Sequence, residues 1–125
     1  MRTRTIKLSP AGSAGAATAS AQVGIPTTTL RAVRVATAGQ SSGTTDVTLT
    51  SLGQTVATLA NLGNGEAVAY PRALASAAED GADLDTAGDE ARVAPIVHNM
   101  LTVAVANGDA RTDGVIVTIF IEDGD

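Results

Sequence analysis

The sequence predicts an all-β fold, and three observations lead to this expectation. From residue 27 onward, short segments rich in β-branched residues recur between turn-forming residues, which is the spacing of a sandwich or barrel. Residues 45–50 alternate polar and apolar side chains, as a strand with one buried face does. No segment has the apolar periodicity of an amphipathic helix of useful length. With 125 residues, the chain has the size of one domain.

The first 26 residues are expected to differ from the rest of the chain. Residues 3–8 alternate polar and apolar side chains and predict a short first strand. Residues 9–22 (SPAGSAGAATASAQ) contain no large apolar side chain, so they predict a loop or an extended, flexible arm that orders only against a partner. The Ala content would also permit a helix, but the Gly and Pro residues and the missing amphipathic stripe make a helix the weaker alternative. The expected organisation is a strand and flexible arm in residues 1–26, followed by a β-sandwich domain in residues 27–125.

The central part of the chain predicts three strands, at residues 28–37, 45–50 and 55–59. Turn-forming residues separate them. Gly53 divides the second strand from the third, and the NLGNG of residues 61–65 follows the third. The strands at residues 45–50 and 55–59 and the turns that follow them therefore fit into about twenty residues, as a sandwich of short strands requires.

The last part of the chain predicts the remaining strands and one long irregular stretch. Residues 66–74 read as an edge or bulged strand, because Pro71 lacks the N–H that a central strand needs. Residues 76–90 are expected to be irregular. Further strands are predicted at residues 92–97, 100–106 and 114–122. The last of these has apolar residues at both parities, which indicates a central strand covered on both faces.

The composition predicts a thin core. Apolar residues make up 44% of the chain, but most are Ala and Val, and there is one Tyr, one Phe and no Trp. Small side chains contribute little transfer free energy each when they are buried. The chain has no cysteine, so disulfides cannot supplement this core. We therefore expect the protein to gain stability by associating with copies of itself or with a larger assembly.

The charge distribution excludes some partners and suggests others. A net charge of −5 argues against a nucleic-acid-binding face, and no apolar run reaches the ~20 residues of a membrane span. Cations gather at the beginning of the chain, whereas residues 79–90 contain six acids. Complementary potentials set the register of an interface, although solvated surface charges are the alternative. The candidate partner-binding residues are Arg2, Arg4, Lys7, Arg31 and Arg34.

No arrangement of residues predicts catalysis or a cofactor. His98 is the only histidine, and no GxSxG turn is present to position a nucleophile. Lys7 lies outside any glycine-rich phosphate loop. Residues 79–90 resemble a calcium loop in composition but not in spacing. A looser divalent-cation site is left open, with ligands drawn from Asp80, Asp83, Asp85 and Asp89. We expect a protein that is not an enzyme.

Four segments follow one another in the last two-thirds of the chain: TDVTLT at residues 45–50, TLAN at 58–61, YPR at 70–72, and the LTVAVANG and VIVTIFIE pair within 101–122. By this order and spacing, residues 27–123 resemble a group of small virion proteins encoded among the head genes of tailed phages. The resemblance implies a capsid decoration (cement) protein with a jelly-roll-like antiparallel β-sandwich of about eight strands. It also implies a trimer seated where capsomers meet.

These expectations combine into one functional hypothesis. The protein is expected to be made in the host cytoplasm and to bind the major capsid protein on the outer surface of the virion as a homo-oligomer, with residues 2–22 clamping adjacent capsid subunits. The alternatives are a head–tail joint or tail-tube protein, and a receptor- or glycan-binding fibre head domain. Exposed aromatics on loop tips would favour the fibre alternative, yet Tyr70 and Phe120 both fall in predicted strands.

Overall fold

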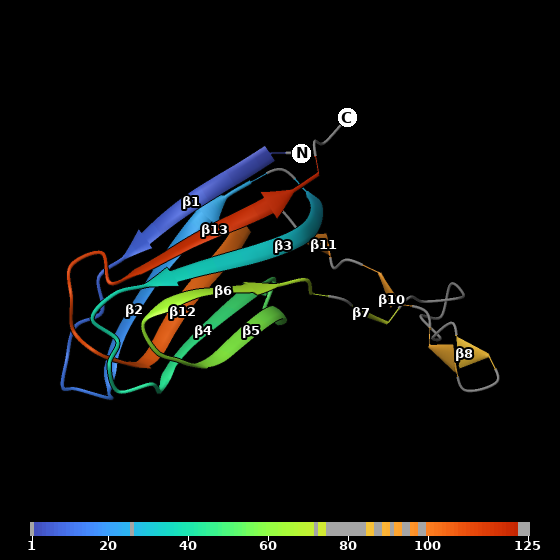
Figure 1. Ribbon diagram of the computed structural model, residues 1–125. Helices are drawn as coiled ribbons and strands as arrows, with labels where there is room; N and C mark the ends of the chain where they lie inside the picture. The colour runs from blue at the N-terminus through green and yellow to red at the C-terminus, as the bar shows by residue number, and fades with distance from the viewer. Residues whose placement is uncertain are drawn as a thin grey trace.

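The protein is built from strands that form two antiparallel sheets, packed face to face as a sandwich (Figure 1). The computed structural model describes residues 2–25, 27–71, 73–74, 85–86, 89–90, 92–93, 96–97 and 100–122. Within these residues there are 13 strands and no helix. The predicted all-β class is confirmed. In the described part of the chain, no helix therefore has the length and hydropathy of a membrane span.

Nine of the strands make up the two sheets. The first sheet contains β1 (Arg2–Leu8), β13 (Val115–Ile121) and β3 (Thr28–Thr37) in that order, with β6 (Gly65–Ala69) and β11 (Ile96–Val97) each paired to β3. The second sheet has the order β2 (Ala17–Gly24), β12 (Met100–Gly108), β4 (Thr45–Ser51) and β5 (Gln54–Leu62). Two short ladders complete the set, β7 (Ala73–Leu74) with β10 (Arg92–Val93), and β8 (Asp85–Thr86) with β9 (Asp89–Glu90).

The strand order is that of a jelly roll. The pairs β1–β13, β2–β12, β3–β6 and β4–β5 are the successive rungs of one long antiparallel hairpin that folds back at the β4–β5 turn. The hairpin then rolls up, so that β13 also pairs with β3 and β12 with β4. Consecutive rungs alternate between the two sheets. The predicted jelly-roll-like sandwich is therefore present.

The core lies between the inner faces of the two sheets and consists mainly of Val, Leu and Ile. On β13 the odd-numbered residues are buried and the even-numbered ones half-buried, which is the alternation of a strand covered fully on one face. On β4, in the second sheet, Val47 and Leu49 are also fully buried. Each such side chain contributes about 1.5–3 kcal/mol when it leaves water. Because no Trp or second Phe is available, many medium-sized side chains supply this burial.

Most predicted strands occur where the alternation placed them. Residues 28–37 form β3 with the predicted bounds, and β1, β4, β5, β12 and β13 match their predictions to within a few residues. The segment 66–74 is divided into β6 and β7 around Tyr70 and Pro71, in keeping with the missing proline donor. Of the stretch predicted to be irregular, residues 85–86 and 89–90 form a short ladder instead, and its other residues from 76 to 88 lie outside the described part.

The flexible arm predicted for residues 9–22 is contradicted for residues 17–22, whereas residues 9–16 lie outside the strands. Residues 17–24 form β2, an edge strand of the second sheet that pairs with β12. Ala17 is fully buried, and Ala19, Ala21 and Val23 pack against the core. The segment lacks large side chains, but it alternates Ala with Thr, Ser and Gln, and this period of two satisfies a strand with one buried face. Residues 2–8 and 17–24 thus each form a strand of one sheet, and these strands cannot serve as a free clamp.

Removing residues 1–22 is therefore expected to unfold the protein. The deletion takes away β1 and most of β2, one edge strand from each sheet, together with the buried Ile6 and Leu8. A loss of this kind is of the order of the whole ~5–15 kcal/mol by which domains are stable. Far-UV circular dichroism and amide NMR dispersion of the truncated chain test this. A dispersed, cooperatively melting sandwich would show that the N-terminal strands are dispensable.

Candidate functional site

The two ends of the sandwich differ in character. The turns β1–β2, β3–β4, β5–β6 and β12–β13 lie together at one end, here called the proximal end (Figure 1). The opposite, distal end carries the start of β1, the described C-terminal residues, the β4–β5 turn, the end of β6 and the start of β12. Antiparallel strands alternate in direction, so every second connection returns to the same end. Candidate binding residues can therefore be assigned to an end from the topology.

Exposed large apolar side chains gather at the distal end. Leu52 is 74% exposed in the β4–β5 turn, and Tyr70 is 67% exposed just after β6. Ile96 of β11 and Met100 at the start of β12 are also exposed. The β12–β4 register pairs Thr102 with Thr50, so continuing it by two residues brings Met100 beside the turn that holds Leu52. Clusters of exposed apolar side chains mark interaction sites more often than single ones do.

Leu52 is held in a conformation that its residue type disfavours. Ser51 pairs with Gln54, so Leu52 and Gly53 form a two-residue hairpin turn. Both have positive φ, 51° and 76°, which is the property of a type I′ turn. Asn-Gly is the preferred pair there, because a branched side chain in the left-handed region costs about 1–2 kcal/mol. A leucine that is both strained and exposed contributes nothing to the core. This points to a role outside the fold.

Three predicted cations lie on the edge strand β1. Arg2 and Arg4 share the parity of the buried Ile6 and Leu8, yet both are exposed. Inward-pointing charges on an edge strand oppose pairing with another sheet. Lys7 has the opposite parity and lies opposite Ile116 on the outer face of the first sheet. Arg2 and Arg4 thus place positive charge on an edge strand, and their binding to a partner stays a prediction.

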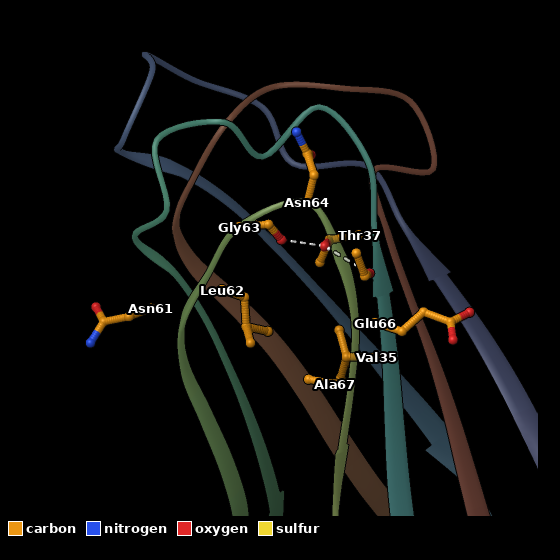
Figure 2. Close-up of a pocket in the computed structure, with 9 residues that line it drawn as sticks. Val35, Thr37, Asn61, Leu62, Gly63, Asn64, Glu66 and Ala67 are labelled. Carbon is orange, nitrogen blue, oxygen red and sulfur yellow. Dashed lines mark hydrogen bonds between the residues drawn. The ribbon is translucent and has the colours of Figure 1, made fainter.

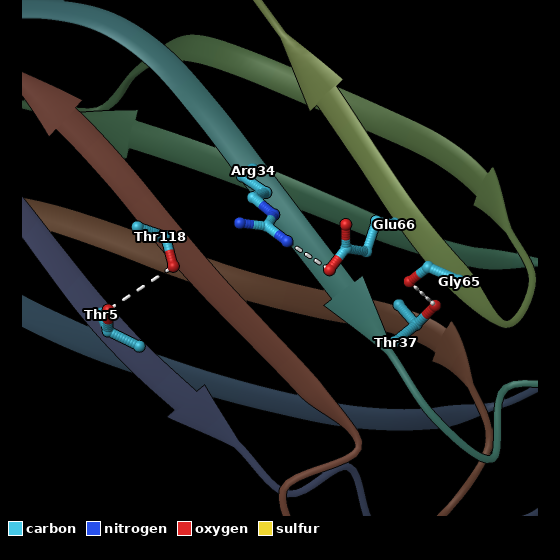
Figure 3. Close-up of polar contacts among 6 residues, drawn as sticks. All are labelled: Thr5, Arg34, Thr37, Gly65, Glu66 and Thr118. Carbon is cyan, nitrogen blue, oxygen red and sulfur yellow. Dashed lines mark hydrogen bonds and ion pairs between the residues drawn. The ribbon is translucent and has the colours of Figure 1, made fainter.

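Arg31 and Arg34 on β3 are ion-paired within the chain. Arg31, at the bulge where β3 shifts register against β13, pairs with Glu122 at the distal end. Arg34 pairs with Glu66 across the β3–β6 ladder, on the outer face of the first sheet (Figure 3). Each arginine side chain is 48% exposed, and exposed ion pairs contribute about 0–1 kcal/mol. Both cations remain accessible, and their contact with a partner is still a prediction.

Several candidates of the sequence lie outside the described residues. His98, Arg72, Asp80 and Asp83 are among them, and only the backbone pairing of Asp85 and Asp89 is described. In the part of the chain that the structure describes, no three His, Cys, Asp or Glu side chains form a group that could hold a metal ion. The divalent-cation site therefore stays an open prediction.

Hydrogen-bonded polar groups form a cluster at the proximal end that no sequence motif predicted. Gln40 is fully buried, and its Nε2 donates to the backbone oxygens of Asp109 (2.9 Å) and Ala38 (3.2 Å). Its Oε1 accepts from the Asp109 N–H and from the Thr45 hydroxyl, both at 2.8 Å. Its own N–H donates to Asn64 Oδ1 at 2.7 Å. Gln40 thus joins its own β3–β4 turn to two others, the β12–β13 turn through its side chain and the β5–β6 turn through its backbone N–H.

Asp109 completes this polar cluster. Its carboxylate accepts from the Ser42 hydroxyl (2.7 Å), the Ser42 N–H (2.8 Å) and the Gly15 N–H (2.9 Å). These donors, the Ser42 hydroxyl first, lower the pKa of Asp109, while burial opposes them. A Cβ at Gly114 would lie 2.9 Å from Gln40 Nε2, so a glycine is needed for this packing. All these groups are satisfied within the chain, and the cluster serves to fix loops.

A shallow pocket lies beside the β5–β6 turn, but it is too small for a drug-sized ligand (Figure 2). Its volume is about 140 Å³, whereas ligand sites typically occupy about 300–1,000 Å³. The Thr37 hydroxyl on its wall donates to the Gly63 and Gly65 carbonyl oxygens and is thus committed to the turn. Leu62 and Val35 supply apolar wall. The distal end is therefore the stronger candidate for binding.

Comparison with known proteins adds no relative. The chain matches no protein-family model, and no curated protein and no solved structure is significantly similar to it.

Replacing Asp109 with Asn is expected to destabilise the protein at neutral pH. An amide places an N–H where the carboxylate accepts hydrogen bonds from Gly15 and Ser42. Because the fold lowers the pKa of Asp109, its ionised form stabilises the fold above the ordinary value of 3.8, and this contribution is lost as the pH falls through the lowered pKa. Urea unfolding from pH 7 to pH 2 should show wild type and variant converging in acid.

The control for this experiment is Asp113→Asn in the same loop. Asp113 is exposed and has a φ of 51°, a conformation that Asn adopts as readily as Asp. Its substitution should leave stability and pH dependence unchanged. A gap between wild type and Asp109→Asn that stays constant into acid would rule out the proposed contribution of the ionised carboxylate.

Proposed function

We propose that this protein is a phage virion structural protein, a decoration or cement subunit that binds the outer surface of a capsid as an oligomer and stabilises the shell. Two lines of reasoning support the proposal. The order and spacing of four sequence segments resemble small head proteins of tailed phages, for which a jelly-roll sandwich is expected. In addition, a sandwich with fixed loops at one end and exposed apolar side chains at the other is suited to docking by its distal end.

The observation that carries the proposal is the side chain of Leu52. It is 74% exposed at the tip of a hairpin, in a turn that prefers Asn. Folding alone gives no reason for a leucine at this position. An apolar side chain at a rigid tip is well placed to enter a pocket on a partner surface, and a few such anchors supply most of the binding energy at typical interfaces.

The distal end, to which Leu52 belongs, carries residue types that are common at interfaces. Tyr70 and Met100 belong to residue types enriched at protein–protein contacts, and Arg31 is accessible at the same end. Many identical sites on a shell would let modest individual contacts stabilise the assembly by mass action. On this proposal the distal end contacts the capsid protein, and the proximal end faces outward.

A second candidate function is glycan or receptor binding by a fibre head, and the exposure of Tyr70 favours it. The sequence placed this tyrosine in a strand, but it follows β6 and is 67% exposed. An exposed aromatic ring of this kind can stack on a sugar. A glycan-array screen decides between the two functions, since a decoration subunit requires capsid and no sugar. The third candidate, a head–tail joint or tail-tube protein, would assemble into rings whose mass identifies them.

Replacing Leu52 with Asn is expected to raise stability and weaken capsid binding together. Asn fits the left-handed turn, so the free energy of unfolding should increase by about 1 kcal/mol. Loss of an apolar anchor should lower the affinity for decoration-free tailed-phage shells about tenfold or more. Thermal melting measures the first effect, and co-sedimentation with the shells measures the second.

A matched control uses the same product residue at the other end. Asp113→Asn also places Asn at a positive φ, but in a proximal loop, so shell binding should not change. Stabilisation without loss of binding in Leu52→Asn would remove Leu52 from the interface. Failure of the wild-type protein to saturate any tailed-phage shell at a fixed ratio would count against the decoration function itself.

A further inference from the structure

The free edge of β2 has unpaired backbone groups. β2 pairs with β12 on one side and with no other strand of the described sheets. At its start, Thr18 and Ala11 exchange two backbone hydrogen bonds of 3.0 and 3.1 Å, on the side away from β12. Alternate residues of an antiparallel strand direct N–H and C=O to the same side. The backbone groups of Ser20, Gln22 and Gly24 therefore also point outward from the sheet.

The other edges are protected against pairing, and β2 is not. β1 carries three cations, including the inward-parity Arg2 and Arg4. β5 has two register shifts against β4, and β6 carries the charge of Glu66. β2 contains no charged residue and no proline, and its pairing with β12 is regular from Ala19 to Gly24. Of the long edge strands among the described residues, it is the one that remains competent to add a strand.

We propose that β2 pairs with β2 of a second copy of the chain, antiparallel, across a two-fold axis at Gln22. The bonds of Thr18 to Ala11 exclude any register that uses Thr18. Of the symmetric registers that avoid Thr18, only one uses all three outward-pointing residues, with Gln22 opposite Gln22 and Ser20 opposite Gly24 of the partner. Each such pair exchanges two backbone hydrogen bonds. The two four-stranded sheets become one continuous sheet through the dimer.

Side chains support this register on both faces. On the inner face, Ala21 lies opposite Val23 of the partner, and these half-buried side chains, already packed against the core, become covered. On the outer face the Gln22 amides meet and can hydrogen-bond to each other. No like charges oppose one another, because β2 has none. A two-fold contact requires such self-complementarity, and β2 fulfils it.

The inference stands apart from the proposed function, since it does not require a capsid. It leads to an even-numbered assembly, which differs from the trimer that the phage resemblance implies. The two ideas can therefore fail separately. A dimer that ignores capsids removes the decoration function alone, whereas a trimer that binds capsids removes the β2 pairing alone.

The test compares single charge substitutions at the axis. Gln22→Lys and Gln22→Glu each place two like charges opposite one another, so each variant should have the mass of one chain, 12.4 kDa, where the wild type has twice that mass. An equimolar mixture of the two variants should restore the dimer, because opposite charges then meet. Light scattering coupled to size exclusion and native mass spectrometry give the masses. Gln54→Lys, an exposed glutamine on the other edge of the same sheet, should remain dimeric.

A cross-linking measurement tests the register without relying on those variants. The chain has no cysteine, so Gln22→Cys introduces a single thiol. Across a hydrogen-bonded pair the Cα atoms lie about 5.5 Å apart, within the roughly 4.4–6.8 Å of disulfides. Oxidation should give a covalent dimer, whereas Ser20→Cys should not. A monomeric wild type, a trimer, or a dimer that is unaffected by Gln22→Lys and not cross-linked through Gln22→Cys would overturn the proposal.

Discussion

The pairing of the first strand with the last is the constraint on which the fold depends. β1 lies beside β13 from Arg2 opposite Ile121 to Leu8 opposite Val115, and the next rungs of the long hairpin follow from it. Once these strands are in register, β2 must meet β12 and the β4–β5 turn must lie at the distal end. The N-terminal segment is therefore a structural part of both sheets, whatever its composition suggests.

Because the core consists of medium-sized side chains, hydrogen bonds in the turns add to the stability that apolar burial supplies. Val, Leu and Ile fill the space between the sheets, and the buried Gln40 fixes three proximal turns with hydrogen bonds in place of apolar burial. A buried amide costs free energy unless all its groups are paired, and here the donors and acceptors are used. One end of the molecule is thus held by polar contacts, while the other keeps exposed apolar groups.

The alternation of side chains predicted most strands, because a sheet with one buried face imposes a period of two. The same rule applied to Ala17–Gly24, but Ala in the buried positions looks like low complexity when only large side chains are counted. The burial of Gln40 was not predicted from the sequence, because burial of a polar residue depends on partners distant in sequence, such as Asp109. Leu52 carried a readable signal, a Leu-Gly pair where a hairpin turn favours Asn-Gly.

The adjacency of β1 and β13 also determines how the molecule responds to force. Arg2 and Ile121 face each other at the distal end, so a tether attached to the N-terminus and one attached to the C-terminal residues would pull neighbouring strands apart from their shared end. Such a load breaks the inter-strand hydrogen bonds one after another, each contributing about 1 kcal/mol, so that β1 separates from β13 step by step. A load along the strands, from one end of the sandwich to the other, would instead shear many bonds at once. Mechanical strength is therefore greatest along the axis that joins the two ends of the sandwich.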